Sequence, residues 1–314
     1  MAMHRIDKVT ENLHGYFSRD LPSILTIASG DTVESSVPDA AWNTRCRRHE
    51  ADTPIQIDRK EPEKDRGHCL IGPIRIQGAM PGDTLEVQVE ALNVGDHGWN
   101  LSGGWVHEVN ERFGLPEKTN LYWKLDPVAL TGTNQHGHTV KLRPFLGVMG
   151  MPIDAPDVQP TAPPRRTGGN LDCKELTVGA SLFLPVELEG GMFSFGDGHA
   201  AQGDGEVSVT AIECPMDHVR LKFIVHRDRP IKFPRVRIDG AWITLGVHED
   251  LNEAVMLAID HMLDLLTERL QVDRGIALAL ASVAADVRIT QIVNGVKGAH
   301  VVLKDDAITS QTPL

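Results

Sequence analysis

The sequence predicts an α+β fold in which short strands dominate and a pair of helices comes near the C-terminus. The 314-residue chain contains 29 glycines and 19 prolines, and such numbers favour strands joined by tight turns over a helical bundle. Apolar and polar residues alternate in several segments of the first three quarters of the chain, as they do in half-buried strands. Helical periodicity begins only near residue 250.

Three segments carry the strand pattern most clearly. Residues 85–91 alternate between apolar and polar side chains directly after the turn Pro81-Gly82-Asp83. The same alternation predicts strands over residues 207–211 and 219–225. Strands that recur with turns between them are typical of a β-sandwich or a barrel.

The segment 151–170 interrupts this pattern. Its prolines exclude a continuous helix or a central strand, so we expect a long loop or a crossing between two parts of the molecule. We place the boundary there, with an N-terminal β-rich part over residues 1–160 and a C-terminal β-rich part with helices over residues 161–314. The prolines are Pro152, Pro156, Pro160, Pro163 and Pro164.

Two helices are predicted at about residues 250–285. Over residues 251–270, apolar side chains fall on one stripe, and Asp250 precedes them as a candidate cap. A second helix is expected over residues 274–285 with Asp273 as its cap. Residues 287–293 then form a strand pattern, which the turn Asn294-Gly295 ends.

The net charge and the spacing of the cysteines limit the kinds of partner and the cellular compartment that fit this sequence. The formal net charge of −12 argues against nucleic acid or an anionic membrane as the main partner, since both attract a basic face. The longest apolar run, residues 276–285, is about half of a membrane span. The N-terminus has no apolar leader segment. Four widely spaced cysteines without a C-x-x-C pair predict free thiols in a cytoplasmic protein.

The densest group of chemically active residues lies between residues 195 and 206. Four glycines there allow the backbone to bend, so that Asp197, His199, Asp204 and Glu206 can converge. Carboxylate oxygens and an imidazole nitrogen suit a zinc-like cation, which activates water when a coordination position stays open. The alternative interpretation is a glycine-rich hairpin loop in which the aspartates cap turns.

A second segment, residues 168–174, also combines glycines with polar side chains. Gly168 and Gly169 precede Asn170 and Asp172, which could reach a ligand together with backbone N–H groups. A plain turn before a strand at 181–186 is the alternative. Cys173 next to Lys174 raises the hypothesis of a thiol nucleophile, because a nearby cation lowers a thiol pKa. Neighbouring strand residues point to opposite faces, however.

Several of these segments recur together, in order, in a known family. The matching stretches are residues 72–83, 144–150, 168–172, 184–186, 193–213 and 282–294. Taken together they resemble the acetamidase/formamidase family. The long glycine- and aspartate-rich stretch around Asp197 and His199 is the most specific of them.

The resemblance implies a fold, an activity and a cofactor. It implies intertwined barrel-like and sandwich-like parts, a homodimer, and hydrolysis of a small aliphatic amide such as formamide or acetamide. It also implies a divalent metal, which we expect to be zinc, with calcium as the alternative. We expect Asp197, His199 and Asp172 to bind the ion.

The remaining roles follow from the same hypothesis. Asp204 or Glu206 would take a proton from water and pass it to the leaving nitrogen, and Asn170 would hold the developing oxyanion. Two alternatives stay open: a thiol-dependent amidase that uses Cys173 with Lys174, and a non-catalytic metal or small-ligand binding protein. The segments near Ser36 and Leu101 depart from the family pattern, which motivates the second alternative.

Overall fold

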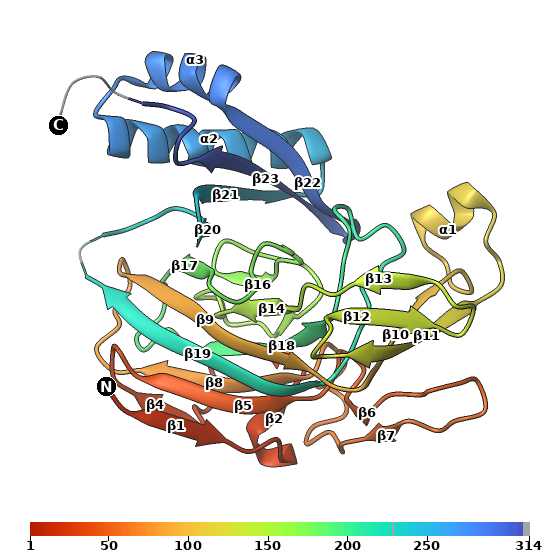
Figure 1. Cartoon of the computed structure of the whole chain (residues 1–314). Helices are drawn as coiled ribbons and strands as arrows, with labels where there is room; N and C mark the ends of the chain where they lie inside the picture. The colour runs from red at the N-terminus through yellow and green to blue at the C-terminus, as the bar shows by residue number, and fades with distance from the viewer. Residues whose placement is uncertain (228, 310–314) are drawn as a thin grey trace.

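The computed structural model, which describes residues 1–227 and 229–309, consists mostly of strands (Figure 1). Two large sheets face one another, and two helices, α2 (Leu251–Leu270) and α3 (Arg274–Ala284), lie across the C-terminal strands. This arrangement confirms the predicted β-rich α+β fold with a helical pair near the C-terminus. Within the described residues, no sheet closes into a barrel.

The larger sheet has nine strands and draws them from the whole length of the chain. Leu221 pairs with Val89 in the antiparallel contact at its centre, so the predicted strands at 85–91 and 219–225 are confirmed. The strands of this sheet lie in the order β1-β5-β19-β9-β17-β20-β21-β23-β22. The bounds are β1 Met3–Ile6, β5 Thr32–Val37, β9 Thr84–Val94, β17 Ser181–Pro185, β19 Met216–His226, β20 Arg235–Ile238, β21 Ala241–His248, β22 Ala285–Asn294 and β23 Val296–Lys304.

The second sheet carries the candidate site. Phe193 on this sheet meets Phe223 on the larger one edge to face, with ring centroids 5.2 Å apart, so the core of the molecule lies between the two sheets. The strands of the second sheet lie in the order β16-β14-β18-β8-β2, and β4 pairs with β8. The bounds are β2 Leu13–His14, β4 Leu25–Ile27, β8 Leu70–Ile76, β14 Phe145–Gly150, β16 Gly168–Asn170 and β18 Phe193–His199.

Smaller elements surround these sheets. A four-stranded sheet extends to the right in Figure 1 and carries the short helix α1 (Glu108–Phe113) between its first two strands. The short strands in the proline-rich segment, β15 (Gln159–Pro160) and β16, are edge pairings, as expected where proline removes a donor. The remaining elements are η1 Thr10–Asn12, β3 Tyr16–Phe17, β6 Asn43–Arg45, β7 Ile55–Gln56, β10 His97–Ser102, β11 Thr119–Asp126, β12 Thr131–Asn134 and β13 Thr139–Lys141.

The helical pair forms as predicted. Asp250 caps α2 by accepting from the backbone N–H of Asn252 at 2.7 Å, and Asp273 caps α3 by accepting from Ile276 at 2.9 Å. The apolar stripe of α2 packs on β21 and β23 in a cluster of its own. None of the helices in the described ranges is both long and apolar enough to cross a lipid bilayer.

The strand predicted over residues 207–211 is wrong. This segment forms turns, and Val207 is 61% exposed. Glu206 and Val209 have φ angles of 46° and 73°, so the backbone is left-handed where the alternation requires it to be extended. The segment borders an opening in the surface, as described below.

The boundary predicted near residue 160 stays a prediction. Strands from before this residue, β5 and β9, pair with β19 and β17 from after it. The two parts therefore share one sheet.

Candidate functional site

Strand β18 brings Asp197 and His199 into the interior of the protein. Both side chains are buried, and the strand runs between β14 and β8. Gly198 is required here because a Cβ atom at this position would lie 2.5 Å from the carbonyl oxygen of Cys214. The missing side chain lets the segment around Glu213 approach β18, and His199 and Glu213 form an isolated antiparallel bridge.

Four carboxylates lie around the His199 ring, those of Asp172, Asp197, Glu206 and Glu213. Its Nε2 lies 3.3 Å from Oδ1 of Asp197 and 3.4 Å from Oε2 of Glu213, and its Nδ1 lies 4.0 Å from Oδ1 of Asp172. Ligand atoms of Asp172, His199 and Glu206 fall within 4.8 Å of one another, as do those of Asp197, His199 and Glu213. We call these five residues the acidic cluster. All are at most 6% exposed.

A glycine leaves space at the centre of the acidic cluster. A Cβ atom on Gly147 of β14 would lie 2.4 Å from Oδ2 of Asp197 and 2.8 Å from Oδ1 of Asp172. One buried oxygen each of Asp172, Asp197, Glu206 and Glu213 has no hydrogen-bond partner of good geometry among the described residues. Buried oxygens without partners are costly. A set of carboxylates with one imidazole around such a space fits a divalent cation.

The electrostatics of the acidic cluster also favour a cation. Burial and the neighbouring charge of Asp172 raise the pKa of Glu206 well above its ordinary value. Burial, aided by the charge of Asp197, raises the pKa of Glu213 to about 8. Burial opposes a charged His199, but Glu213 and Asp197 outweigh it and raise the pKa of the imidazole. The positive charge near the four acids is therefore too small to keep all of them ionised. A bound cation would supply the missing positive charge.

The backbone is strained at three of the five residues. Asp172, Asp197 and Glu206 have φ angles of 47°, 62° and 46°, in the left-handed region that costs non-glycine residues energy. Asp197 adopts this conformation inside a strand. Strain of this kind persists where the surrounding structure fixes it, and it gathers at functional sites.

Two further residues hold the acidic cluster in place by hydrogen bonds. Oε1 of Gln202 accepts from His199 Nδ1 at 3.0 Å, and the amide nitrogen of Gln202 donates to the carbonyl oxygen of Asp172 at 2.8 Å. Asn294, at the end of β22, donates to Oδ2 of Asp172 at 2.5 Å. The charge of His68 lowers the pKa of Asp197, together with that of His199, although burial opposes the shift.

Two openings lead toward the acidic cluster. A cavity of about 780 Å³ includes Glu213, His68 and Trp99 in its lining, and we call it the entry cavity. A second cavity of about 380 Å³ includes Glu206 and Gln202. Residues of the turn segment 207–211, among them the exposed Val207, also line this second cavity.

Asp204 lies in a different cluster. Its Oδ1 lies 3.0 Å from Nζ of Lys174, and its Oδ2 lies 2.5 Å from Nη2 of Arg288. Arg288 also bonds Glu175 at 3.0 Å. Burial opposes the change, but Lys174 and Arg288 lower the pKa of Asp204. The proton-transfer role predicted for Asp204 has no support in this geometry, because two cations occupy its oxygens. The same cations make this group unsuitable for a metal ion.

The positions of Asn170 and Cys173 also give no support to the roles predicted for them. Asn170 pairs with Val148 on β14, whereas the acidic cluster converges over Gly147, and neighbouring strand residues face opposite sides. Its amide donates to the carbonyl oxygen of Ala162 at 3.1 Å. Cys173 is fully buried, and burial and Glu175 raise the pKa of its thiol well above the ordinary value. A thiolate is therefore disfavoured there.

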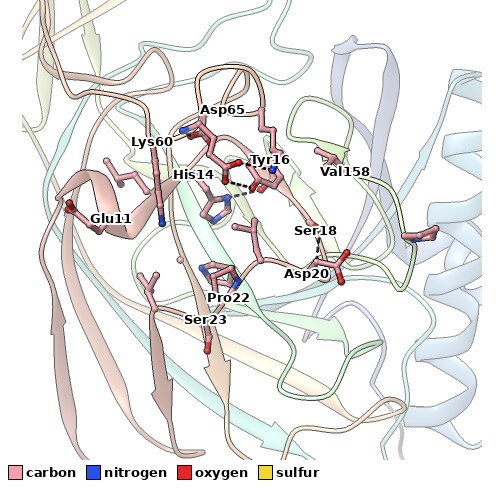
Figure 2. Close-up of a pocket in the computed structure, with 18 residues that line it drawn as sticks. Glu11, His14, Tyr16, Ser18, Asp20, Pro22, Ser23, Lys60, Asp65 and Val158 are labelled. Atoms are coloured by element: carbon pink, nitrogen blue, oxygen red, sulfur yellow. Dashed lines mark hydrogen bonds and ion pairs between the residues drawn. The ribbon is translucent and has the colours of Figure 1, made fainter.

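A third cavity, of about 360 Å³, lies near the N-terminal segment, and its lining includes no residue of the acidic cluster (Figure 2). His14 is buried beside it, with Nδ1 2.6 Å from the carbonyl oxygen of Tyr16 and Nε2 2.9 Å from Oγ of Ser194. Burial lowers the pKa of His14 to about 4, so the ring is neutral at neutral pH and acts as a structural link.

The sequence indicated four of the five residues of the acidic cluster. The structure places Asp172, Asp197 and His199 around one space, with Glu206 beside them. Glu213, Gly147 and Asn294 were not assigned a role. Glu213 is a strand-pairing partner of His199, and no local spacing reveals a contact across a long loop.

Comparisons with known proteins agree with this architecture. The pattern that defines the acetamidase/formamidase family matches residues 2–156 and 152–303. A formamidase of Methylophilus methylotrophus is 26% identical over 254 residues, 62% of this chain and 60% of the relative. An acetamidase of Mycolicibacterium smegmatis is 30% identical over 201 residues, 45% of this chain and 49% of the relative. The chain thus aligns with about half to three fifths of the length of these relatives.

The fold recurs in a solved structure. The crystal structure of an acetamidase from Bacillus halodurans superposes with a TM-score of 0.84 at 27% identity, and the match covers 96% of this chain and 97% of that chain.

Proposed function

The chain belongs to the acetamidase/formamidase family, and from this membership we propose that it hydrolyses a small aliphatic amide to a carboxylic acid and ammonia. The observation that carries the proposal is the acidic cluster, in which buried carboxylates surround the His199 ring and the space over Gly147. It lies beside a cavity large enough for a substrate.

The acidic cluster fits the divalent metal that the family resemblance implies. Asp172, Asp197 and His199 would hold the ion, with Glu206 and Glu213 within reach, and we propose zinc, with calcium as the alternative. When bound, such an ion polarises the amide carbonyl and lowers the pKa of water. The chain's contribution is a rigid donor set, because Gln202 and Asn294 fix His199 and Asp172 by hydrogen bonds.

Proton transfer is assigned to Glu206 and Glu213. In the reaction the acyl carbon gains the oxygen of water, the C–N bond breaks, and the nitrogen leaves as ammonia after it receives a proton from that water. A group that moves this proton must reach the reacting atoms. Glu213 lines the entry cavity and Glu206 lines the second opening, and each has a buried oxygen free of good hydrogen bonds.

One pair of variants tests the site. His199→Ala removes the imidazole at the centre of the acidic cluster, and His136→Ala removes an exposed histidine as the control. Metal content and ammonia release from formamide and acetamide are measured with zinc or calcium supplied. We expect His199→Ala to lose its metal and at least about 100-fold of kcat/KM, and His136→Ala to lose neither. Retained ammonia release in His199→Ala would overturn the assignment.

The same panel separates the proposed function from the binding-protein alternative. A non-catalytic protein on this scaffold would bind a metal and release no ammonia from any amide tested. Ammonia release from one short amide removes that alternative.

We also propose that the protein is a homodimer. The apolar side chains Ile276 and Val283 lie seven residues apart on one face of α3, and Val287 continues from there along β22. Val283 is 83% exposed. Strand β22 ends the nine-stranded sheet. Gly205 covers its outer edge at Thr290 and Ile292, and over residues 285–289 this edge has no strand partner in the described part of the chain. An exposed apolar face next to an open edge fits a second copy of the chain.

Sedimentation tests this interface. Val283→Lys places a charge in the apolar face and is expected to yield a monomer, whereas Val128→Lys, at a position 93% exposed between β11 and β12, is expected to leave a dimer. A Val283→Lys protein that sediments as a dimer would contradict the proposal.

We also propose a cytoplasmic location. Four free cysteines in a reduced state support it: Cys46, Cys69, Cys173 and Cys214.

A further inference from the structure

The entry cavity is larger than a formamidase or acetamidase substrate requires. Its volume of about 780 Å³ lies within the range of about 300–1,000 Å³ that pockets for much larger ligands occupy. Acetamide has only a methyl group besides its amide. The size of the cavity therefore points to an acyl group that extends well beyond the carbonyl carbon.

The lining of the entry cavity carries charges of both signs. Glu213 belongs to the acidic cluster, whereas the lysine and arginine residues of the lining, Arg59, Lys64 and Arg66, are accompanied by a single further acid, Glu63. Apart from Glu213, cations thus outnumber acids in the lining. The whole chain has a net charge of −12, so this local excess of positive charge opposes the charge of the molecule as a whole. A cavity lined by one sign of charge attracts ligands of the other sign.

Arg59 is the cation best placed to bind a ligand. Lys64 is paired with Glu61 at 2.6 Å, and Arg66 is paired with Glu63 at 2.5 Å. Arg59 has no ion-pair partner within the described ranges and rests over the ring of Trp42, 5.3 Å from its centroid. Stacking on an aromatic ring orients a guanidinium while leaving its N–H groups free. A carboxylate is the planar acceptor that such a group binds with two hydrogen bonds.

We propose that the preferred substrate is a primary amide whose acyl chain ends in a carboxylate, which Arg59 binds. This inference rests on the proposed amide hydrolysis and names the substrate class of the same site. Arg59 attracts the carboxylate, which leaves the amide end of the molecule free to reach Glu213 in the same lining. Trp99, Val158 and Val209 also line the cavity and offer apolar surface to the methylene groups of the chain.

A comparison of two amides of equal length tests the inference. Succinamic acid carries an amide and a carboxylate, and butanamide has the same chain without the charge. For the unmodified protein with zinc supplied, we expect kcat/KM to be about tenfold higher for succinamate. The ratio should fall as ionic strength rises, because salt screens an exposed charge pair.

Two variants assign the effect to Arg59. In Arg59→Gln the ratio of succinamate to butanamide should fall close to one, whereas Arg45→Gln, which removes an exposed arginine on β6 outside the cavity, should keep the full ratio. The ratio is insensitive to a general loss of folding, since both substrates use the same protein.

The outcomes distinguish a failure of the carboxylate proposal from a failure of the amidase proposal. Hydrolysis of acetamide and butanamide without any preference for succinamate overturns the carboxylate proposal and leaves the amidase proposal standing. The same holds if Arg59→Gln keeps the preference. Release of no ammonia from any amide overturns the amidase proposal, and the substrate class falls with it.

Discussion

The side-chain amide of Asn294 donates to Oδ2 of Asp172 at 2.5 Å, although 122 positions separate the two residues in the chain. Asn294 is the last residue of β22, at the far edge of the nine-stranded sheet, and Asp172 follows β16 of the other sheet. This bond ties the helical end of the molecule to the acidic cluster. It leaves Oδ1 of Asp172 directed at the space over Gly147.

Replacement of Asn294 should therefore weaken the site without touching a substrate. Asn294→Ala frees the Asp172 carboxylate, and we expect a loss of about 10- to 100-fold in metal affinity and in kcat/KM. Asn294→Asp should be worse than Asn294→Ala, because it sets a like charge against Asp172. Metal titration followed by assay checks this order. Asn252→Ala, exposed at the start of α2, is the control, and equal affinities in all three proteins would refute the role.

Filling the space over Gly147 should abolish activity. In Gly147→Ala the new methyl group would lie 2.4 Å from Oδ2 of Asp197, so at least one ligand must move. A displacement of about 1 Å costs on the order of 100-fold in rate. Gly203→Ala is the matched control, because a Cβ atom there has nothing within 4 Å. Metal content and ammonia release are measured for both, and a fully active Gly147→Ala would show that the space is not used.

Cys173→Ala should keep its turnover. The thiol is fully buried and donates toward Glu175 at 3.7 Å, and its raised pKa keeps it protonated. We expect kcat within about twofold of the unmodified protein and a stability loss of about 1 kcal/mol from lost packing. Loss of turnover with unchanged metal content would instead favour the thiol-dependent amidase.

Asp204→Asn should lower stability more than activity. The substitution removes the charge that Lys174 and Arg288 contact and leaves two partly buried cations without a partner. We expect a decrease of about 1 to 2 kcal/mol in the free energy of unfolding, measured by urea denaturation, with kcat/KM nearly unchanged. A loss of rate larger than about tenfold at unchanged stability would return Asp204 to the reaction.

Acid should destabilise the protein partly through His14. Its pKa is lowered from an ordinary 6.5 to about 4 by burial, so below pH 6.5 the unfolded chain binds a proton that the folded chain does not. The free energy of unfolding then falls as the pH drops from 6.5 toward 4, with about 2 kcal/mol lost between pH 7 and pH 5.

A variant isolates this contribution. His14→Asn should show a pH dependence smaller by that amount in urea denaturation at pH 7 and pH 5. His136→Asn, at an exposed position, should keep the dependence of the unmodified protein. An unchanged slope in His14→Asn would mean that His14 is not the group responsible.

The sequence predicted those parts of the fold that depend on local pattern. Alternation located β9 and β19, and helical periodicity with Asp250 and Asp273 located the helical pair. The same alternation failed over residues 207–211, because left-handed backbone at Glu206 and Val209 overrides the period of two. Periodicity reports which side chains face an apolar surface and not whether the backbone is extended.

The candidate site was predictable only where its residues are close in the chain or belong to a recognised motif. Asp197 and His199 lie close together in the glycine-rich stretch from which their convergence was predicted, and both belong to β18. Glu213 and Asn294 reach the same space through strand pairing across long separations. The role of Asp204 in proton transfer stays a prediction. Its oxygens pair with Lys174 and Arg288, and no local spacing indicates these contacts.

The spread of the acidic cluster along the chain has a consequence for biosynthesis. The acidic cluster and its support come from residues 147 to 294, so on the ribosome no shorter nascent chain can complete the site. Until β22 is made, Asp172 lacks the hydrogen bond from Asn294. The complete arrangement of the cluster therefore forms only after the last strands have been translated.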